Sequence, residues 1–221
     1  MDDLMSVHDD RCRLVLILND NTDAEAQKTA LTEALRGGDV ASVIVPQYAQ
    51  PEGAFQKFTE TLVPVIQGAG AAALIAGDTR IAGRAKADGL HINGPVADVA
   101  EAVEKFTPKM IVGGGNADDR HKALEIGEPG PDYIFFGKFD GDIKPEAHPK
   151  NLALAEWWAS MIEIPCMVMG GNDTASAAAV AETGAEFVAM GRAVFEHAAG
   201  PAQAVAEINA LLDEKAPRFE D

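Results

Sequence analysis

Two short stretches near the end of the chain decide the fold: CMVMGGNDT at Cys166–Thr174 and FVAMGRA at Phe187–Ala193. Each is a run of four apolar residues that ends in glycine, which is typical of a buried strand followed by a tight turn. A helix-like stretch, Ala175–Glu182, lies between them. Strand, helix and strand in this order predict a βαβ unit with two parallel strands.

The same alternation continues outward over the rest of the chain. Apolar runs predict six further strands, at Arg13–Leu18, Ser42–Pro46, Ala72–Ala76, Gly89–Ile92, Lys109–Val112 and Asp132–Phe136. Helical patterns fall between or after them, at Ala24–Leu35, Phe55–Gln67, Val99–Phe106, Leu152–Met161 and Ala202–Lys215. Eight strands are more than an open doubly wound sheet usually has, so the sequence predicts a single (β/α)8 TIM barrel. No linker divides the chain, so residues 1–221 are expected to form one domain, with residues 1–12 as a flexible N-terminal tail.

Composition and charge restrict the partners and the location. The 221 residues carry a net charge of −17, which would repel a nucleic acid. The apolar runs are shorter than the ~20 residues that cross a bilayer, and Met1–Arg13 has no apolar signal core. Cys12 and Cys166 are too few for a disulfide framework and lack metal-ligand spacing. We therefore expect a cytoplasmic protein with neither a nucleic-acid nor a membrane partner.

In a TIM barrel the active site lies at the carboxyl ends of the strands, and the last two strands commonly bind phosphate. Gly170 and Gly171 follow the seventh predicted strand, and Gly191 and Arg192 follow the eighth. Backbone N–H groups at such turns attract an anion, and an arginine adds a charged fork. These residues predict a site for a small phosphorylated metabolite. In the alternative, the glycines only form turns and Arg192 pairs with a surface acid.

Three polar residues at other strand ends are further candidates. Asp78 follows the third strand and is placed either to bind Mg²⁺ or to cap a helix that starts at Thr79. His91 and Asn93 alternate along the fourth strand and therefore share one side of it. His91 is either an acid–base group or a hydrogen-bonded histidine of the core, and Asn93 is a possible ligand contact.

The sixth strand is followed by a long polar loop, GKFDGDIKP at residues 137–145, which suggests a mobile lid. Lys138 and Lys144 in this loop can contact a phosphate or can be ordinary solvated lysines, and Gln47 after the second strand is a further possible contact. Trp157 and Trp158 are compatible with internal packing or with a contact in a homo-oligomer.

Several motifs occur in an order typical of one enzyme family. They are Leu16–Asp20, Ala34–Val40, Gly77–Asp78 followed by Ala87–Ile92, Pro131–Gly137 and Ile164–Gly171. With these motifs the chain resembles the thiamine phosphate synthase family over nearly its whole length. Enzymes of that family join an aminopyrimidine diphosphate to a thiazole phosphate and release pyrophosphate with Mg²⁺. The pyrimidine leaves its diphosphate as a carbocation-like species, which the thiazole nitrogen captures.

By position, the resemblance implies that Asp78 is a magnesium ligand and that Lys144 is the lysine of a lid. It also implies that Gly170 and Gly171 bind the thiazole phosphate. The sequence departs from the family pattern at several positions: Gly77 replaces an Asn, Val96 stands near an expected second metal-binding Asp, Gly115 replaces a Ser, Val43–Pro46 replaces Gln-x-Arg-x-Lys, and Gly141–Lys144 replaces Thr-x-Thr-Lys.

Three functions are therefore compatible with the sequence. The first is the thiamine phosphate synthase reaction. The second is a non-catalytic or altered-specificity barrel that binds a phosphorylated ligand without the diphosphate and magnesium site. The third is an isomerase, tautomerase or lyase that acts on a phosphorylated small molecule with His91 or Lys144 as the acid–base group.

Overall fold

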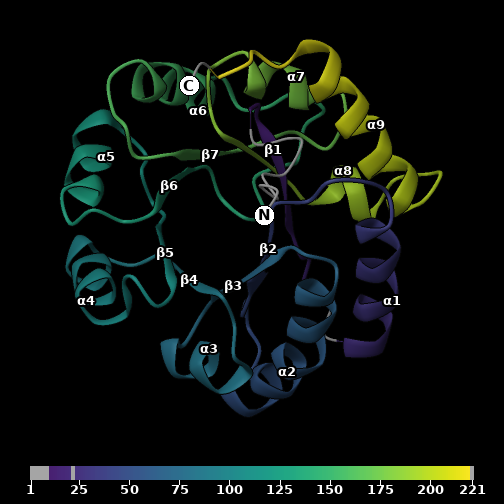
Figure 1. The fold of residues 1–221 in the computed structure, drawn as a ribbon, viewed down its shortest axis with the longest axis vertical. Helices are drawn as coiled ribbons and strands as arrows, with labels where there is room; N and C mark the ends of the chain where they lie inside the picture. Colours follow the sequence, from purple (N-terminus) through teal and green to yellow (C-terminus); the bar gives the residue numbers. More distant parts are fainter. Residues whose placement is uncertain (1–9, 21–22, 220–221) are drawn as a thin grey trace, which may run out of the picture.

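The computed structural model describes residues 10–20 and 23–219, and over these residues eight parallel strands close into a barrel (Figure 1). Each strand pairs with the next along the chain, and β8 pairs with β1. The strands are β1 (Arg13–Ile17), β2 (Ser42–Pro46), β3 (Ala72–Ala76), β4 (Gly89–Ile92), β5 (Ile111–Gly114), β6 (Tyr133–Phe136), β7 (Cys166–Met169) and β8 (Phe187–Met190). The predicted (β/α)8 barrel is confirmed.

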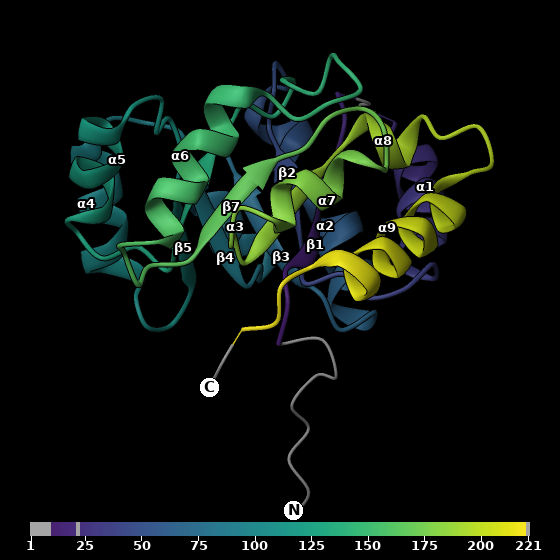
Figure 2. The ribbon, with the colours of Figure 1, turned by 90° about the horizontal axis from the view of Figure 1, so that it is seen from above.

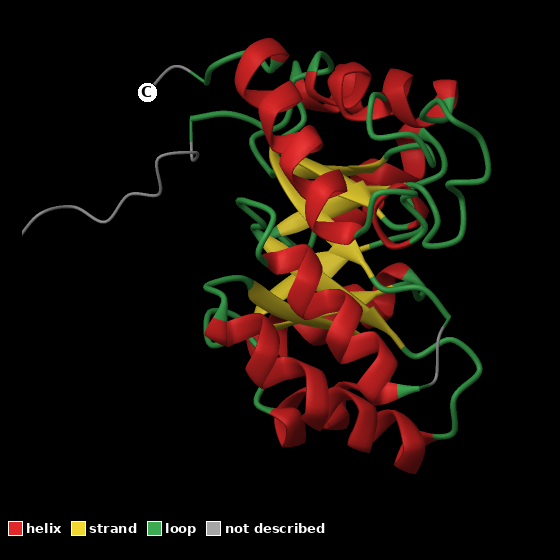
Figure 3. Ribbon diagram, turned by 90° about the vertical axis from the view of Figure 1, so that its right-hand side faces the viewer, coloured by secondary structure: helices red, strands yellow, loops and turns green. Residues whose placement is uncertain are grey.

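Helices surround this barrel on its outside (Figure 3). They are α1 (Ala24–Leu35), α2 (Glu52–Gly68), α3 (Thr79–Ala85), α4 (Val96–Phe106), α5 (Arg120–Gly127), α6 (Pro149–Ala159), α7 (Ser176–Ala181), α8 (Arg192–Phe195) and α9 (Pro201–Lys215). Sequence periodicity did not predict α3, α5 or α8, although a helix starting at Thr79 was one interpretation of Asp78. The first turn of α5 consists largely of charged and polar residues, and α8 is a single turn, so neither helix has a long apolar stripe.

The strands contribute to two apolar layers, because successive side chains point to opposite faces. Val15 and Ile17 of β1 belong to the core inside the barrel, whereas Leu14 and Leu16 belong to the layer between barrel and helices. Burial on both faces explains why the strands are almost uninterrupted apolar runs.

The fifth strand corrects the sequence prediction, because it spans Ile111–Gly114 rather than Lys109–Val112. The N–H groups of Lys109 and Met110 donate to the Phe106 carbonyl at 2.9 and 3.0 Å, so this segment is the turn that ends α4. Gly113 is required inside the strand, since a Cβ atom there would lie only 2.0 Å from Cζ of Tyr133. The sequence analysis placed the end of this strand too early, because two consecutive glycines, Gly113 and Gly114, are typical of a loop.

The two ends of the described chain meet on the side of the barrel where the strands begin (Figure 2). Arg11 and Arg218 form an antiparallel bridge, and Nε of Arg11 donates to the Asp213 carboxylate at 2.8 Å. Arg11 and Cys12 are buried, so the predicted flexible tail does not include them; residues 1–9 lie outside the described residues. The carboxyl ends of the strands, and with them the candidate site, lie on the opposite side.

Candidate active site

The carboxyl ends of β7 and β8 lie side by side. Val168 pairs with Val188, and the Gly170 N–H donates to the Ala189 carbonyl at 2.9 Å. The structure therefore brings Gly170, Gly171, Gly191 and Arg192 to one edge of the barrel mouth.

The backbone donors at this edge are hydrogen-bonded within the chain. The Gly171 N–H donates to Oγ of Ser176 at 2.9 Å, and the Asn172 N–H donates to the Lys144 carbonyl at 2.8 Å. The Arg192 N–H donates to Oδ2 of Asp142 at 2.7 Å. The third of these contacts differs from the others, because its acceptor is a carboxylate, an anion.

Asp142 comes from the loop after β6, and its side chain is only 2% exposed. Its Oδ1 lies 3.6 Å from Nε of Arg192, so the carboxylate faces both the backbone N–H and the guanidinium of the same residue. Burial raises the pKa of Asp142, while the Arg192 N–H and guanidinium act in the opposite direction. A buried carboxylate is thus held where the sequence predicts a phosphate.

We call residues 138–147, which connect β6 to α6, the β6–α6 strap. Its backbone contacts the β7 turn, because a Cβ atom on Gly171 would lie 2.0 Å from the Pro145 carbonyl oxygen. Its Phe139 packs against the core inside the barrel. The Phe139 ring centroid lies 5.0 Å from that of His91 and 5.6 Å from that of Phe135. The predicted lid therefore lies across the mouth of the barrel.

His91 is buried in the interior of the barrel and both of its ring nitrogens are hydrogen-bonded. Nε2 lies 3.0 Å from Oδ1 of Asn93, which can only accept, so Nε2 carries the proton and Nδ1 accepts from the Tyr133 hydroxyl at 2.9 Å. Burial lowers the pKa of His91 to about 4, against the opposing effect of the Asn93 bond. The structure places His91 as a neutral, hydrogen-bonded core histidine, the second of the two interpretations, with Asn93 at the exposed end of the pair.

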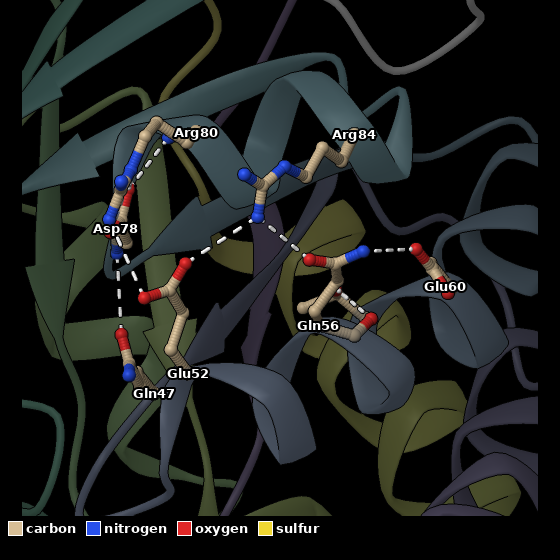
Figure 4. A network of polar contacts seen from close by, with 8 residues as sticks. Gln47, Glu52, Gln56, Glu60, Asp78, Arg80 and Arg84 are labelled. Carbon is tan, nitrogen blue, oxygen red and sulfur yellow. Dashed lines mark hydrogen bonds and ion pairs between the residues drawn. The ribbon is translucent and has the colours of Figure 1, made fainter.

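Asp78 lies on another side of the mouth, after β3 (Figure 4). Its carboxylate caps α3 by accepting from the Arg80 N–H at 2.9 Å, and it also accepts from Nε of Arg80 at 3.0 Å. These side-chain and backbone bonds from Arg80 lower the pKa of Asp78 to about 2. Gln47 joins this group, because its Oε1 accepts from the Asp78 N–H at 3.3 Å.

The same side carries a chain of acids and cations (Figure 4). Glu52 accepts from Arg80 and from Arg84, both at 3.5 Å, and Arg84 also donates to Gln56 at 2.9 Å. The two candidate lysines, in contrast, lie on the strap with exposed side chains. Lys138 lines a cavity of about 320 Å³ with Asn116 and His148, next to the strap.

With the strap in this position, the centre of the mouth holds a small cavity of about 70 Å³. It is lined by residues after β1, β2, β6 and β8, among them Asn19, Tyr48, Phe139, Asp142 and Arg192. The Tyr48 hydroxyl donates to the Leu18 carbonyl at 2.9 Å, and burial followed by the nearby Asp140 and Asp142 raises the pKa of Tyr48. The cavity is smaller than the roughly 300 Å³ at the lower end of the range for ligand pockets.

The chain matches the family model for thiamine monophosphate synthase over residues 14–194. The chain belongs to the thiamine monophosphate synthase family. Thiamine-phosphate synthase of Rhodospirillum centenum is 35% identical over 91% of this chain and 98% of the relative. That of Hyphomonas neptunium is 34% identical over 92% and 95%. The solved thiamine phosphate pyrophosphorylase of Pyrococcus furiosus shares the fold, with a TM-score of 0.77, 21% identity and coverage of 94% and 98%.

Membership in the thiamine monophosphate synthase family raises the question of magnesium, which the resemblance implies at Asp78. Over residues 10–20 and 23–219, no three His, Cys, Asp or Glu side chains are grouped so that they could hold a metal ion. The Asp78 carboxylate is already neutralised by Arg80. The residues present therefore do not fit a resident magnesium ion, and Asp78 takes the helix-capping role, the alternative that the sequence left open.

The sequence analysis did not identify three residues that decide the geometry of this site: Phe139, Asp142 and Arg80. Phe139 and Asp142 lie in a polar loop, in which the sequence analysis named only the two lysines as candidates. An apolar aromatic residue in such a loop was the available signal, because it needs a place to be buried. Arg80 was detectable as the cation two residues after a helix-capping Asp.

Proposed function

We propose that this chain catalyses the thiamine phosphate synthase reaction, joining an aminopyrimidine diphosphate to a thiazole phosphate and releasing pyrophosphate. Family membership supports this proposal, as do relatives that carry this activity in their names and align over 95% or more of their own lengths. The shared region runs from β1 into α8 and therefore includes every strand end that forms the mouth.

The observation that carries the proposal is the anion position at the β7–β8 edge. A carboxylate is held there by the Arg192 backbone N–H at 2.7 Å, with the guanidinium 3.6 Å away. A phosphate carries more charge and more acceptor oxygens than a carboxylate, so it is suited to the same donors. We propose that the thiazole phosphate binds at this edge, with the Arg192 N–H and guanidinium as its donors. Gly170, Gly171 and Gly191 form the turns that allow its close approach, because the N–H groups of Gly170 and Gly171 are already bonded to Ala189 and Ser176.

The other ligand contacts follow from the rest of the mouth. Lys138 and Lys144 are exposed cations on the strap, and we propose that they contact the diphosphate of the pyrimidine. Asn93 and Gln47 lie at the ends of β4 and β2, within the same mouth, and are proposed as polar contacts to the rings. His91 then acts as a positioning residue, because its Nε2–H fixes the side chain of Asn93.

The test is to incubate the purified protein with both substrates and to measure pyrophosphate release, with and without Mg²⁺. We expect release that requires the thiazole phosphate, and a clear reduction in the Arg192→Ala variant. Arg84→Ala, which removes an exposed arginine far from this edge, serves as the matched control. Release that is absent or independent of the thiazole phosphate under both conditions would contradict the proposal.

One observation favours a second function, a barrel that binds a phosphorylated ligand without catalysis. The Asp78 carboxylate, which the resemblance assigns to magnesium, is bound to Arg80. Loss of a preorganised charged group can reduce a reaction rate by about 10²–10³-fold. This function predicts that the thiazole phosphate raises the melting temperature while the substrate pair yields no pyrophosphate.

We further propose a cytoplasmic location and a single functional domain over residues 1–221. The buried free thiols of Cys12 and Cys166 are consistent with a reducing compartment. Over the described residues, no helix is long and apolar enough to cross a membrane. Sedimentation of the purified chain would test whether it forms a homo-oligomer, which the sequence left open. Of the two tryptophans that the sequence offered for internal packing or for such a contact, Trp157 is partly buried, whereas Trp158 is in the core.

A further inference from the structure

The β6–α6 strap carries two chemically different groups close together in sequence. Phe139 presents an aromatic ring, and Asp142 presents a carboxylate. Both groups point into the barrel mouth rather than into solvent, although the residues between them, Asp140 and Gly141, are exposed. A ring and an anion in this arrangement resemble the two parts of a ring compound that bears a phosphate.

The ring occupies the interior end of the mouth. Phe139 packs against the barrel core, at 5.0 Å from the His91 ring and 5.6 Å from the Phe135 ring, measured between centroids. These are distances at which aromatic rings attract one another. The planar ring of a substrate that entered the mouth would need this same apolar space.

The carboxylate occupies the polar edge of the mouth. Asp142 accepts from the Arg192 N–H at 2.7 Å and is nearly fully buried. Gly191 makes room for it, because a Cβ atom there would lie 3.0 Å from Oδ2 of Asp142. The only described cation beside this carboxylate is Arg192, which is also the cation of the proposed phosphate site.

The strap is also fixed through its backbone. The Lys144 carbonyl accepts from the Asn172 N–H at 2.8 Å, and the Pro145 carbonyl packs directly over Gly171. The glycine turns of β7 and β8 therefore allow the close approach of another segment of this chain. A phosphate at these turns cannot bind while the strap holds them.

We propose that the β6–α6 strap is an intramolecular competitor of the phosphorylated substrate, with Phe139 in the place of its ring and Asp142 in the place of its phosphate. This inference rests on the proposed phosphate site at the β7–β8 edge. Binding then requires the strap to leave, so the apparent dissociation constant equals the intrinsic one divided by the fraction of molecules whose strap is open. A substitution that weakens the strap contact raises that fraction and tightens binding.

The experiment compares Asp142→Asn with Asp140→Asn in the full-length protein. Both variants remove one negative charge from the strap, but Asp140 is exposed and Asp142 is buried against Arg192. Isothermal titration with the thiazole phosphate measures affinity. Asparagine keeps one acceptor for the Arg192 N–H, but its NH2 group, a donor, then faces the Nε donor of Arg192, which lies 3.6 Å from Oδ1 of Asp142. We therefore expect the affinity of Asp142→Asn to rise about ten-fold over wild type, and that of Asp140→Asn to stay within about two-fold.

Amide hydrogen exchange gives a second readout, which needs no knowledge of the intrinsic affinity. If the ligand displaces the strap, peptides that cover residues 138–147 exchange faster when the thiazole phosphate is added. If the strap instead closes over the ligand as a lid, the same peptides exchange more slowly. In the ligand-free protein, Asp142→Asn should already exchange faster over these residues than Asp140→Asn.

The possible failures are distinguishable. Absence of thiazole phosphate binding by wild type and both variants refutes the proposed phosphate site, and the competitor role with it. Equal binding by wild type and Asp142→Asn, or slower strap exchange with ligand, refutes the competitor role and leaves the phosphate site standing. Tighter binding by Asp142→Asn together with faster strap exchange supports both.

Discussion

The two sides of the barrel mouth, after β3 and at the β7–β8 edge, each hold a carboxylate, but through different kinds of contact. After β3, Asp78 is paired with Arg80, a residue two positions away in the same segment. At the β7–β8 edge, Asp142 comes from a loop fifty positions before its partner Arg192. The first pair is local and forms with the start of α3, whereas the second exists only while a separate segment lies across the mouth.

This difference separates a structural ion pair from a replaceable one. Asp78 gains its contacts from the geometry of a helix N-terminus, which remains when a ligand enters. Asp142 accepts from the first residue of α8, but the acid itself lies on the β6–α6 strap, which has no helix or strand, so another anion can compete with it for this donor. The two sides can therefore be compared by matched substitutions, and the β7–β8 side should respond to ligand while the β3 side should not.

The largest contrast is expected for the two arginines. Arg192→Ala removes the guanidinium at the proposed phosphate site, and we expect the affinity for the thiazole phosphate to fall about 10–100-fold, the range for a charged hydrogen bond. Arg84→Ala removes an arginine of similar exposure from the β3 side, 49% against 41%, and should change the affinity less than about two-fold. Titration calorimetry checks both. Equal losses of affinity in the two variants would mean that the affinity depends only on net charge and that the β7–β8 edge is not the phosphate site.

A smaller contrast is expected when a methyl group is added to a glycine on each side. In Gly171→Ala the new Cβ would lie 2.0 Å from a strap carbonyl, and backbone has to move, which costs about 1–3 kcal/mol of unfolding free energy. In Gly83→Ala, within α3 on the β3 side, the new Cβ meets no atom within 4 Å, and alanine is the better helix former, so we expect no loss of unfolding free energy and a gain of at most about 1 kcal/mol. Urea denaturation measures both. If the two changes in unfolding free energy are equal, the strap does not press on the β7 turn.

Most of the fold follows from the sequence because its signals are local. Seven strands have the predicted bounds to within one residue, since an apolar run bounded by turn residues specifies each of them. β5 was misplaced because Gly113 is determined by Tyr133, which lies twenty residues further along. A glycine that makes room for a distant ring cannot be told from a glycine in a loop.

The candidate site was less predictable, for the same physical reason. The glycines and Arg192 at the β7–β8 edge could be named, because strand ends converge in a barrel. The sequence could not predict that Asp142 occupies this edge, because the contact depends on the path of a loop in three dimensions. The sequence even offered a different explanation for the glycines, room for a ligand, where the structure shows room for the strap.

The smallest effects, those of pH, separate the two carboxylates by sign. The pKa of Asp78 is held near 2, below the value of about 3.9 in an unfolded chain, so its stabilisation is present above pH 4 and is lost as the pH falls through 2. Because the pair is partly exposed, the loss is below about 1 kcal/mol and is weaker in high salt.

The pKa of Asp142 is raised, so its ionised form destabilises the folded chain above pH 4, and this penalty disappears as the pH falls towards 4. Asparagine does not titrate, so the difference in unfolding free energy between wild type and Asp142→Asn should shift in favour of wild type as the pH falls from 7 to 4. The difference between wild type and Asp78→Asn should stay constant over that range and decline only below it. If both differences follow the same pH dependence, the two carboxylates share one environment, and the distinction between a structural and a replaceable acid is wrong.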